Sequence, residues 1–290
     1  ILVLSPQRLS QFANSIAAFL FKIIELGRWT RISSAFNFMD NSISGSVPTQ
    51  LALMTEMVQY LYLSRNSLNG TLPSELGAMP KLVRRVGITS NSLTGTLPTE
   101  LGTMVMRSYL DVHSNSLTGT LPTELGEWTD YYTYLSFNGN QLRGRIPTEF
   151  GRWGSFHSTL YFSSNQLTGE VPSELGALAT MKGTLRLESN SLNGTVPTEL
   201  GLLTGLYTNF DLSSNDLTGA IPSELGRLTV MQEAFYLDSN SLNGTVPTQF
   251  GLMSQMGVYF YMQTNSLSGR IPSEFGLMTG MSSSFRLGTN

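Results

Sequence analysis

Apolar and polar residues alternate in short stretches that recur at a fixed interval along the chain, as in Leu61-Tyr62-Leu63 and Phe260-Tyr261-Met262. An alternation of period two predicts a short β-strand with one buried face. Because such a strand cannot stand alone, we expect successive copies to pair in parallel at a spacing of roughly 4.8 Å. The stacked copies would then share one continuous core.

A nearly invariant segment follows each predicted strand, and one copy is NSLTGTLPTELG at residues 91–102. Its first Asn recurs every 25 residues, except for one interval of 24 between Asn91 and Asn115. A Pro lies seven residues after each of the first ten of these Asn residues, and a Gly lies three residues before each Pro. One unit is therefore repeated at least ten times, which predicts a sheet roughly 45–50 Å long. The positions are Asn41, Asn66, Asn91, Asn115, Asn140, Asn165, Asn190, Asn215, Asn240, Asn265 and Asn290.

The invariant positions fit a chain that turns out of a sheet and then returns to it. A buried Asn can satisfy backbone groups that a turn leaves unpaired. The Gly permits conformations that other residues resist, and the Pro fixes φ where the return begins. The Thr or Ser after the Pro is predicted to cap a short helical turn, and the Gly after Leu or Phe to close that turn.

The pattern LxLxxNxLxGxIPxxLG, which covers about residues 20 to 290, resembles the signature of plant-type leucine-rich repeats. The resemblance implies an α/β solenoid, a right-handed superhelix with a parallel concave β-sheet and 3₁₀ or short helical turns on the convex side. It also implies extracellular recognition, since family members are mostly receptor ectodomains and inhibitors of wall-degrading enzymes. This chain departs from the family in having one extra residue between helical turn and strand, and in lacking cysteine-bearing caps.

We divide the chain into two parts. Residues 1–22 fit the repeat poorly and are a candidate cap for the first coil, and residues 23–290 form a domain of about ten to eleven repeats. The absence of cysteine removes disulfides and thiolate metal sites. A net charge of −3 without a basic patch argues against nucleic acid as a partner. The most apolar run, residues 16–24, contains Lys22 and is too short to span a bilayer.

Catalytic motifs are missing, so we expect neither enzymatic activity nor a cofactor. The histidines His113 and His157 stand in different repeats and have no partner at metal-ligand spacing, so we interpret them as surface residues. A column of Glu residues could bind cations, or it could place negative charge near the free N–H groups of the helical turns. Gln at positions 50 and 249 favours the second interpretation, and we expect no metal site. The column contains Glu25, Glu75, Glu100, Glu124, Glu149, Glu174, Glu199, Glu224 and Glu274.

The positions that vary flank the buried residues of each strand and should project from the concave face. They are rich in Tyr and Arg, the residue types that supply much of the binding energy at protein surfaces. We therefore predict a recognition surface for a protein, peptide or glycan ligand. Its residues are Tyr60, Tyr62, Arg85, Tyr109, Asp111, Tyr134, Tyr161, Arg186, Asp211, Tyr236, Tyr259 and Tyr261.

Two other functions stay open. Low charge would suit a structural protein of a surface coat, wall or filament that self-associates. Threonine pairs such as Thr94/Thr96 and Thr118/Thr120 could bind ice, although Arg143, Arg145 and Glu170 interrupt the array. Three sequons for N-glycosylation, at Asn69, Asn193 and Asn243, share one repeat position and support a secretory route to the outside or the surface of the cell.

Overall fold

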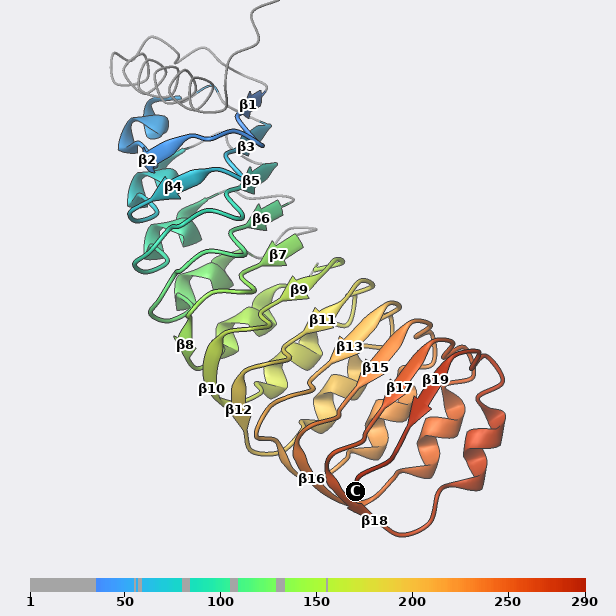
Figure 1. The fold of residues 1–290 in the computed structure, drawn as a ribbon. Helices are drawn as coiled ribbons and strands as arrows, with labels where there is room; N and C mark the ends of the chain where they lie inside the picture. The colour runs from blue at the N-terminus through green and yellow to red at the C-terminus, as the bar shows by residue number, and fades with distance from the viewer. Residues whose placement is uncertain are drawn as a thin grey trace, which may run out of the picture.

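The structure is a computed structural model, and it describes residues 35–54, 56, 59–79, 84–104, 109–128, 134–154 and 156–290. Successive coils stack along one axis, and the stack curves as a whole (Figure 1). Within a coil, the chain runs through an inner strand, a lateral segment and a 3₁₀ helix. The predicted N-terminal segment 1–22 lies outside the described residues.

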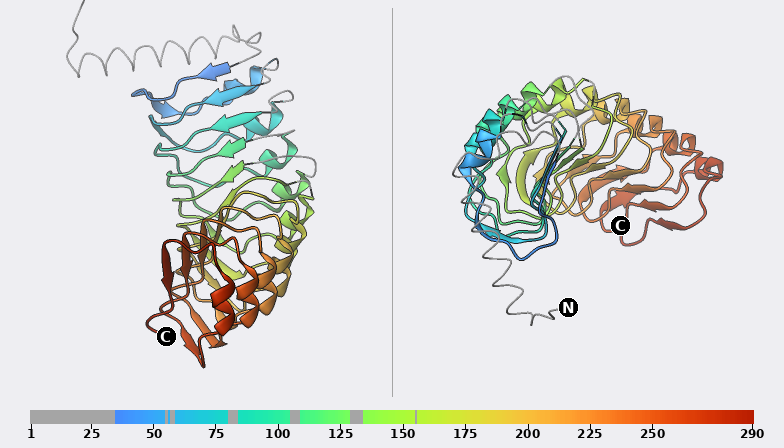
Figure 2. Two further views of the ribbon diagram at one scale, coloured as in Figure 1. Left: turned by 90° about the vertical axis from the view of Figure 1, so that its right-hand side faces the viewer. Right: turned by 90° about the horizontal axis from the view of Figure 1, so that it is seen from above.

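The inner strands form one parallel sheet of eleven strands among the described residues. Equivalent residues of adjacent coils are in register, as in the pairs Phe210–Phe235 and Phe235–Phe260. Figure 2 shows this sheet on the inside of the arc and the 3₁₀ helices on the outside, which confirms the predicted solenoid. In order across the sheet the strands are β1 (Ala35–Asn37), β3 (Tyr60–Tyr62), β5 (Arg85–Gly87), β6 (Tyr109–Asp111), β7 (Tyr134–Ser136), β9 (Leu160–Tyr161), β11 (Leu185–Arg186), β13 (Asn209–Asp211), β15 (Ala234–Tyr236), β17 (Tyr259–Tyr261) and β19 (Ser284–Arg286).

A second set of short parallel strands, which the sequence analysis did not predict, forms three lateral sheets. Here the register is offset from the repeat, so that Thr168 lies opposite Ser191. The first sheet contains β2 (Ser44–Ser46) and β4 (Ser67–Asn69). The second contains β8 (Arg143–Gly144), β10 (Gln166–Glu170) and β12 (Ser191–Asn193), and the third β14 (Thr218–Ala220), β16 (Ser241–Thr245) and β18 (Ser266–Ser268).

The outer turns are 3₁₀ helices, and the predicted capping by their hydroxyl groups is wrong. Pro occupies the N-cap position in an extended conformation, and none of the ten described helices has a side-chain cap. The hydroxyl lies one residue inside the helix, where it hydrogen-bonds to the next side chain, as Thr99 Oγ1 does to Glu100 Oε2 at 3.3 Å. The helices are η1 (Thr49–Leu53), η2 (Ser74–Ala78), η3 (Thr99–Thr103), η4 (Thr123–Glu127), η5 (Thr148–Arg152), η6 (Ser173–Ala177), η7 (Thr198–Leu202), η8 (Ser223–Arg227), η9 (Thr248–Leu252) and η10 (Ser273–Leu277).

The Gly inside nine of the ten described 3₁₀ helices, η2 to η10, has a different role from the predicted one. The helix η7 continues through Gly201 to Leu202, so this Gly does not close the turn. A Cβ atom at Gly201 would lie only 2.4 Å from the carbonyl oxygen of Glu224 in the next coil. The residue is Gly because the backbone of the next coil leaves no room for a side chain at this point.

The repeated Asn residues join the coils, as their chemistry predicted. The Asn91 oxygen accepts a hydrogen bond from Leu68 N–H of the preceding coil at 2.9 Å. Its amide nitrogen donates to the carbonyl oxygens of Leu63, also in that coil, and Thr89. The residue before each described Asn adopts a left-handed φ, for example +52° at Ser90, and this turns the chain out of the sheet.

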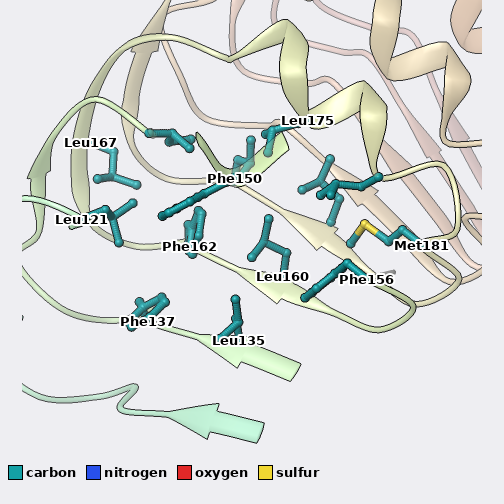
Figure 3. Packing of buried hydrophobic residues seen from close by; sticks show 14 of the residues in the cluster. Leu121, Leu135, Phe137, Phe150, Phe156, Leu160, Phe162, Leu167, Leu175 and Met181 are labelled. Carbon is teal, nitrogen blue, oxygen red and sulfur yellow. The ribbon is translucent and has the colours of Figure 1, made fainter. Parts of the chain in front are cut away.

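The core is a continuous column of buried side chains between the inner sheet and the 3₁₀ helices. Phe137, Phe150, Phe156 and Phe162 fill its middle section (Figure 3). Farther along, the rings of Phe210, Phe235 and Phe260 stack at centroid distances of 5.2 and 5.1 Å. This packing holds the inner strands in fixed positions, so the side chains on their opposite face are fixed in relation to one another.

Candidate functional site

The concave face carries three rows of side chains across the inner strands. The first and second rows, six and four residues before each Asn, contain the twelve predicted contact residues. A third row, two residues before each Asn, lies just past the strand ends and was not predicted. It contains Ser64, Thr89, His113, Asn138, Ser163, Glu188, Ser213, Asp238 and Gln263.

Aromatic rings and one guanidinium group form a strip over strands β3 to β9. The Arg85 guanidinium carbon lies 5.8 Å from the ring centroid of Tyr60 and 5.7 Å from that of Tyr109. Tyr109 stacks on Tyr134 at 4.6 Å, and Tyr134 meets the edge of Tyr161 at 5.5 Å. The structure therefore brings these predicted residues from five neighbouring strands into one surface.

Asp111 lies beneath this strip and is not a free contact residue. It is only 2% exposed, because the Tyr109 hydroxyl donates to Oδ2 at 2.6 Å and His113 Nδ1 lies 2.6 Å from Oδ1. Burial, followed by the hydrogen bond to Asp111, raises the pKa of Tyr109 well above its usual range. Asp111 also orients the ring of the partly exposed His113, a contact that the sequence analysis did not predict. Asp111 and His113 are two residues apart, so their side chains lie on the same face of an extended chain, and this spacing could have predicted the contact.

Arg186 and Asp211 occupy the middle of the second row. The Arg186 guanidinium lies 5.7 Å from the Tyr161 ring centroid. The Asn209 amide is oriented so that its nitrogen donates to the Thr208 carbonyl oxygen and its oxygen accepts from Arg186 Nη2 at 3.0 Å. Asp211 is buried, and its Oδ1 accepts hydrogen bonds from Ser213 Oγ at 2.6 Å and Ser213 N–H at 3.0 Å. Like Asp111, Asp211 was predicted as a contact residue but lies mostly below the surface.

Three tyrosines gather at the C-terminal part of the face, as their positions predicted. The ring centroids of Tyr236 and Tyr261 are 5.1 Å apart, those of Tyr259 and Tyr261 5.7 Å, and those of Tyr236 and Tyr259 6.2 Å. The Arg286 guanidinium lies over Tyr261 at 4.6 Å. Large rings of this kind offer contact area at a low cost in conformational entropy.

Three carboxyl groups of the second and third rows, those of Glu188, Asp211 and Asp238, lie in a partly desolvated environment. Burial, together with the negative charge of Asp211, raises the pKa of Glu188 to about 7. Burial also raises the pKa of Asp211 and of Asp238. Among the described residues, no three His, Asp or Glu side chains converge as a metal site would require.

The lateral sheets present a second regular surface. Threonines of adjacent coils lie opposite each other in the pairs Thr71–Thr94, Thr96–Thr118 and Thr195–Thr218. Their side chains are held in place, since Thr218 Oγ1 donates to the Gly194 carbonyl oxygen at 3.2 Å and the Thr195 methyl group covers Gly219. The sequon residues Asn69, Asn193 and Asn243 are exposed on strands β4, β12 and β16 of this surface.

Comparison with known proteins identifies the class. A leucine-rich-repeat family model matches residues 57–79, 108–128, 133–153, 158–178 and 208–228. The structure is similar to that of a TDR receptor, with a TM-score of 0.81 and 23% identity over 96% of this chain and 50% of that one. It is also similar to the ectodomain of the membrane receptor kinase GASSHO1/SCHENGEN3 from Arabidopsis thaliana in complex with CASPARIAN STRIP INTEGRITY FACTOR 2 (TM-score 0.68, 27% identity, 92% and 37% of the two chains). A plant ice-binding protein has a TM-score of 0.67 and 25% identity over 84% and 76% of the two chains.

Among curated proteins, none matches this sequence. The fold is a solenoid of stacked coils, and the concave face of its inner parallel sheet is open to solvent. Leucine-rich repeats thus recur along the chain, which spans half or less of the length of the two receptor chains. Within the described residues, no helix is both long and apolar enough to cross a bilayer.

Proposed function

We propose that this chain is a non-enzymatic recognition module that binds a protein or peptide through its concave face, outside the cell or at its surface. The observation that carries this proposal is the placement of Tyr and Arg side chains on adjacent strands of one stiff sheet. Stacking and hydrogen bonds already hold many of them, such as Tyr109 and Tyr134, so little further entropy is lost on binding.

The likeness to a receptor ectodomain solved in complex with its ligand supports this function and an extracellular location. Glycan ligands and self-association stay predictions. No described feature of the concave face supports a reaction, because its most organised polar group, Asp111 with Tyr109 and His113, already satisfies itself internally.

The experiment selects peptides from a random library that bind the immobilised chain, and then compares variants. Replacing Tyr236, Tyr259 and Tyr261 by Ala should weaken binding of most selected peptides by about 100-fold or more, as expected when hot-spot aromatics are lost. The matched control replaces Leu202, Leu252 and Leu277, which are exposed on the outer 3₁₀ helices, by Ala. If the tyrosine variant binds the selected peptides as tightly as this control, the proposal is wrong.

A second candidate is ice binding by the lateral sheets. The fixed threonine pairs and the likeness to a plant ice-binding protein favour it. Thermal hysteresis should then fall when Thr71, Thr94, Thr96 and Thr118 are replaced by Lys, and should be unaffected by the tyrosine variant. A wild-type solution without measurable hysteresis would eliminate this candidate.

A further inference from the structure

The concave face presents an unbalanced positive charge over strands β3 to β9. Apart from His113, the three rows of side chains in this part of the face contain one basic residue, Arg85, and one acidic residue, Asp111. Arg85 is exposed, whereas Asp111 is 2% exposed and already accepts a hydrogen bond from the Tyr109 hydroxyl. The charge that a ligand meets here is therefore that of the Arg85 guanidinium group.

Within the described part of the chain, Arg85 has no ion pair. Two other exposed arginines are paired, since Arg65 Nη1 lies 3.3 Å from Asp40 Oδ1 and Arg152 Nη1 lies 3.1 Å from Glu127 Oε1. A surface guanidinium group without a counter-charge is available to an anionic group of the ligand.

Three tyrosines hold the Arg85 guanidinium group in place. Its central carbon lies 5.8 Å from the ring centroid of Tyr60 and 5.7 Å from that of Tyr109, on the strands at either side of β5. A hydrogen bond with the Tyr62 side chain raises the pKa of Arg85. Gly87 leaves room for the Tyr62 ring to lie across β5, since a Cβ atom at this position would be 3.0 Å from Tyr62 Cδ1. A group that is already held loses little entropy on binding.

The chemistry of the guanidinium group selects the complementary ligand group. Contacts with aromatic rings use no N–H donor, and Tyr62 is the described side chain that hydrogen-bonds to Arg85, so most of its five N–H donors stay available. The planar fork of these donors matches the two oxygens of a carboxylate, which can accept two parallel hydrogen bonds. In a peptide ligand, Asp and Glu side chains supply this group.

The opposite part of the face has the reverse balance of charge. Over β11 to β15, the three rows contain the carboxyl groups of Glu188, Asp211 and Asp238 and a single basic side chain, that of Arg186. An acidic side chain of the ligand is therefore disfavoured there, and a difference of this kind fixes the orientation of a bound partner.

We infer that Arg85 binds the side-chain carboxylate of an Asp or Glu residue in the peptide ligand and thereby sets the direction in which the ligand lies along the concave face. The adjacent ligand residues contact the stacked rings of Tyr109 and Tyr134. From β5 to β15, which carries Tyr236, the sheet has six strand spacings, about 29 Å, which roughly nine extended residues cover. This inference rests on the proposed function and specifies its ligand.

The test selects twelve-residue peptides from a random library in which the peptide C-terminus is fused to the carrier, so that only side chains supply carboxylates. Selected peptides that contain Asp or Glu are then synthesised with an amidated C-terminus, each beside its Asn or Gln version, and measured by fluorescence anisotropy. The acidic version should bind the wild-type chain about 10-fold or more tightly than the amide version.

Variants of the chain then assign this preference to Arg85. The preference for the acidic version should be lost in Arg85→Gln and reduced in Arg85→Lys, which keeps the charge but not the planar fork. The matched control is Arg227→Gln, which makes the same change in net charge at an exposed position of the outer helix η8 and should keep the preference.

The outcomes separate the inference from the function on which it rests. If the Tyr236/Tyr259/Tyr261 variant loses peptide binding but Arg85→Gln keeps the preference, or if wild type shows no preference, the inference is wrong and the proposed function stands. The inference is also wrong if binding depends on Arg85 only when the peptide has a free C-terminal carboxylate, since the terminus is then the bound group. If no selected peptide depends on the tyrosines, the proposed function fails and the inference fails with it.

Discussion

The Asn215 side-chain nitrogen lies 3.1 Å from the carbonyl oxygen of Leu187, a residue of the preceding coil. The oxygen of the same side chain accepts from Leu192 N–H, also in that coil, at 3.0 Å. Asn215 is buried, so water cannot replace these bonds. One side chain thus connects the inner strand and the lateral segment of its neighbour. Asn140, Asn165 and Asn240 make the equivalent pair of bonds to the coils that precede them.

Replacement of Asn215 by Ala should therefore lower the free energy of unfolding by about 2–3 kcal/mol, because it leaves buried backbone groups without partners. Hydrogen exchange should speed up in the coils on either side of the substitution, since neighbouring repeats stabilise each other. Asn193→Ala, in an exposed position of the same repeat unit, is the control and should change stability by less than about 0.5 kcal/mol. Equal effects of the two substitutions on stability would contradict the role of the repeated Asn residues in joining the coils.

The close approach of coils at the outer helices gives a second prediction. Gly201→Ala should destabilise the chain by about 2 kcal/mol or more, because the added methyl group would meet the Glu224 carbonyl. Gly276 occupies the same position in the last described coil, where a Cβ atom would meet nothing within 4 Å. Gly276→Ala should be neutral or slightly stabilising in urea denaturation. Similar losses of stability in both variants would show that these positions require Gly for their own backbone conformation and not for the approach of the next coil.

The sequence predicted the solenoid because the Asn, Gly and Pro positions each solve a local problem that recurs in every coil. It did not predict the lateral strands β10 or β16, because their pairing depends on an offset between coils that a single unit does not encode. The same limit explains the incorrect roles given to Thr99 and Gly201. Both were interpreted from local propensities, whereas the Pro before Thr99 and the coil after Gly201 decide their environments.

For the candidate site, the sequence predicted which residues share a face but not how deeply each one lies. Asp111 and Asp211 alternate with buried residues like the tyrosines, yet hydrogen bonds from Tyr109 and Ser213 draw their short side chains beneath the surface. The third row was missed because Glu188 and Asp238 follow the strands and do not belong to the alternating stretch. Their position became evident only from the register of adjacent coils.

The three sequon residues are exposed on the lateral sheets, away from the concave face, so glycans there would not obstruct a concave ligand. Expression in a eukaryotic secretory host should add glycans at Asn69, Asn193 and Asn243, visible as a mass decrease after enzymatic deglycosylation. Replacing the three residues by Gln should remove the mass difference and leave peptide binding unchanged. Glycans at these positions would cover the threonine pairs, so loss of peptide binding on glycosylation would place the ligand on the lateral sheets instead.

The pKa of Glu188, raised to about 7, predicts how stability depends on pH. The folded chain binds a proton at this carboxyl more tightly than the unfolded chain does, so the free energy of unfolding should fall as pH rises from about 4.5 to 7. The loss is complete above that range and amounts to about 2 kcal/mol, given the partial solvent contact of the side chain. Glu188→Gln should abolish this contribution and make the chain more stable than wild type at about pH 8, as measured by urea denaturation across this range. The control Glu174→Gln, on an outer helix, should keep the wild-type dependence of the free energy of unfolding on pH. If the Glu188→Gln variant shows the same dependence as wild type, another group causes the loss of stability.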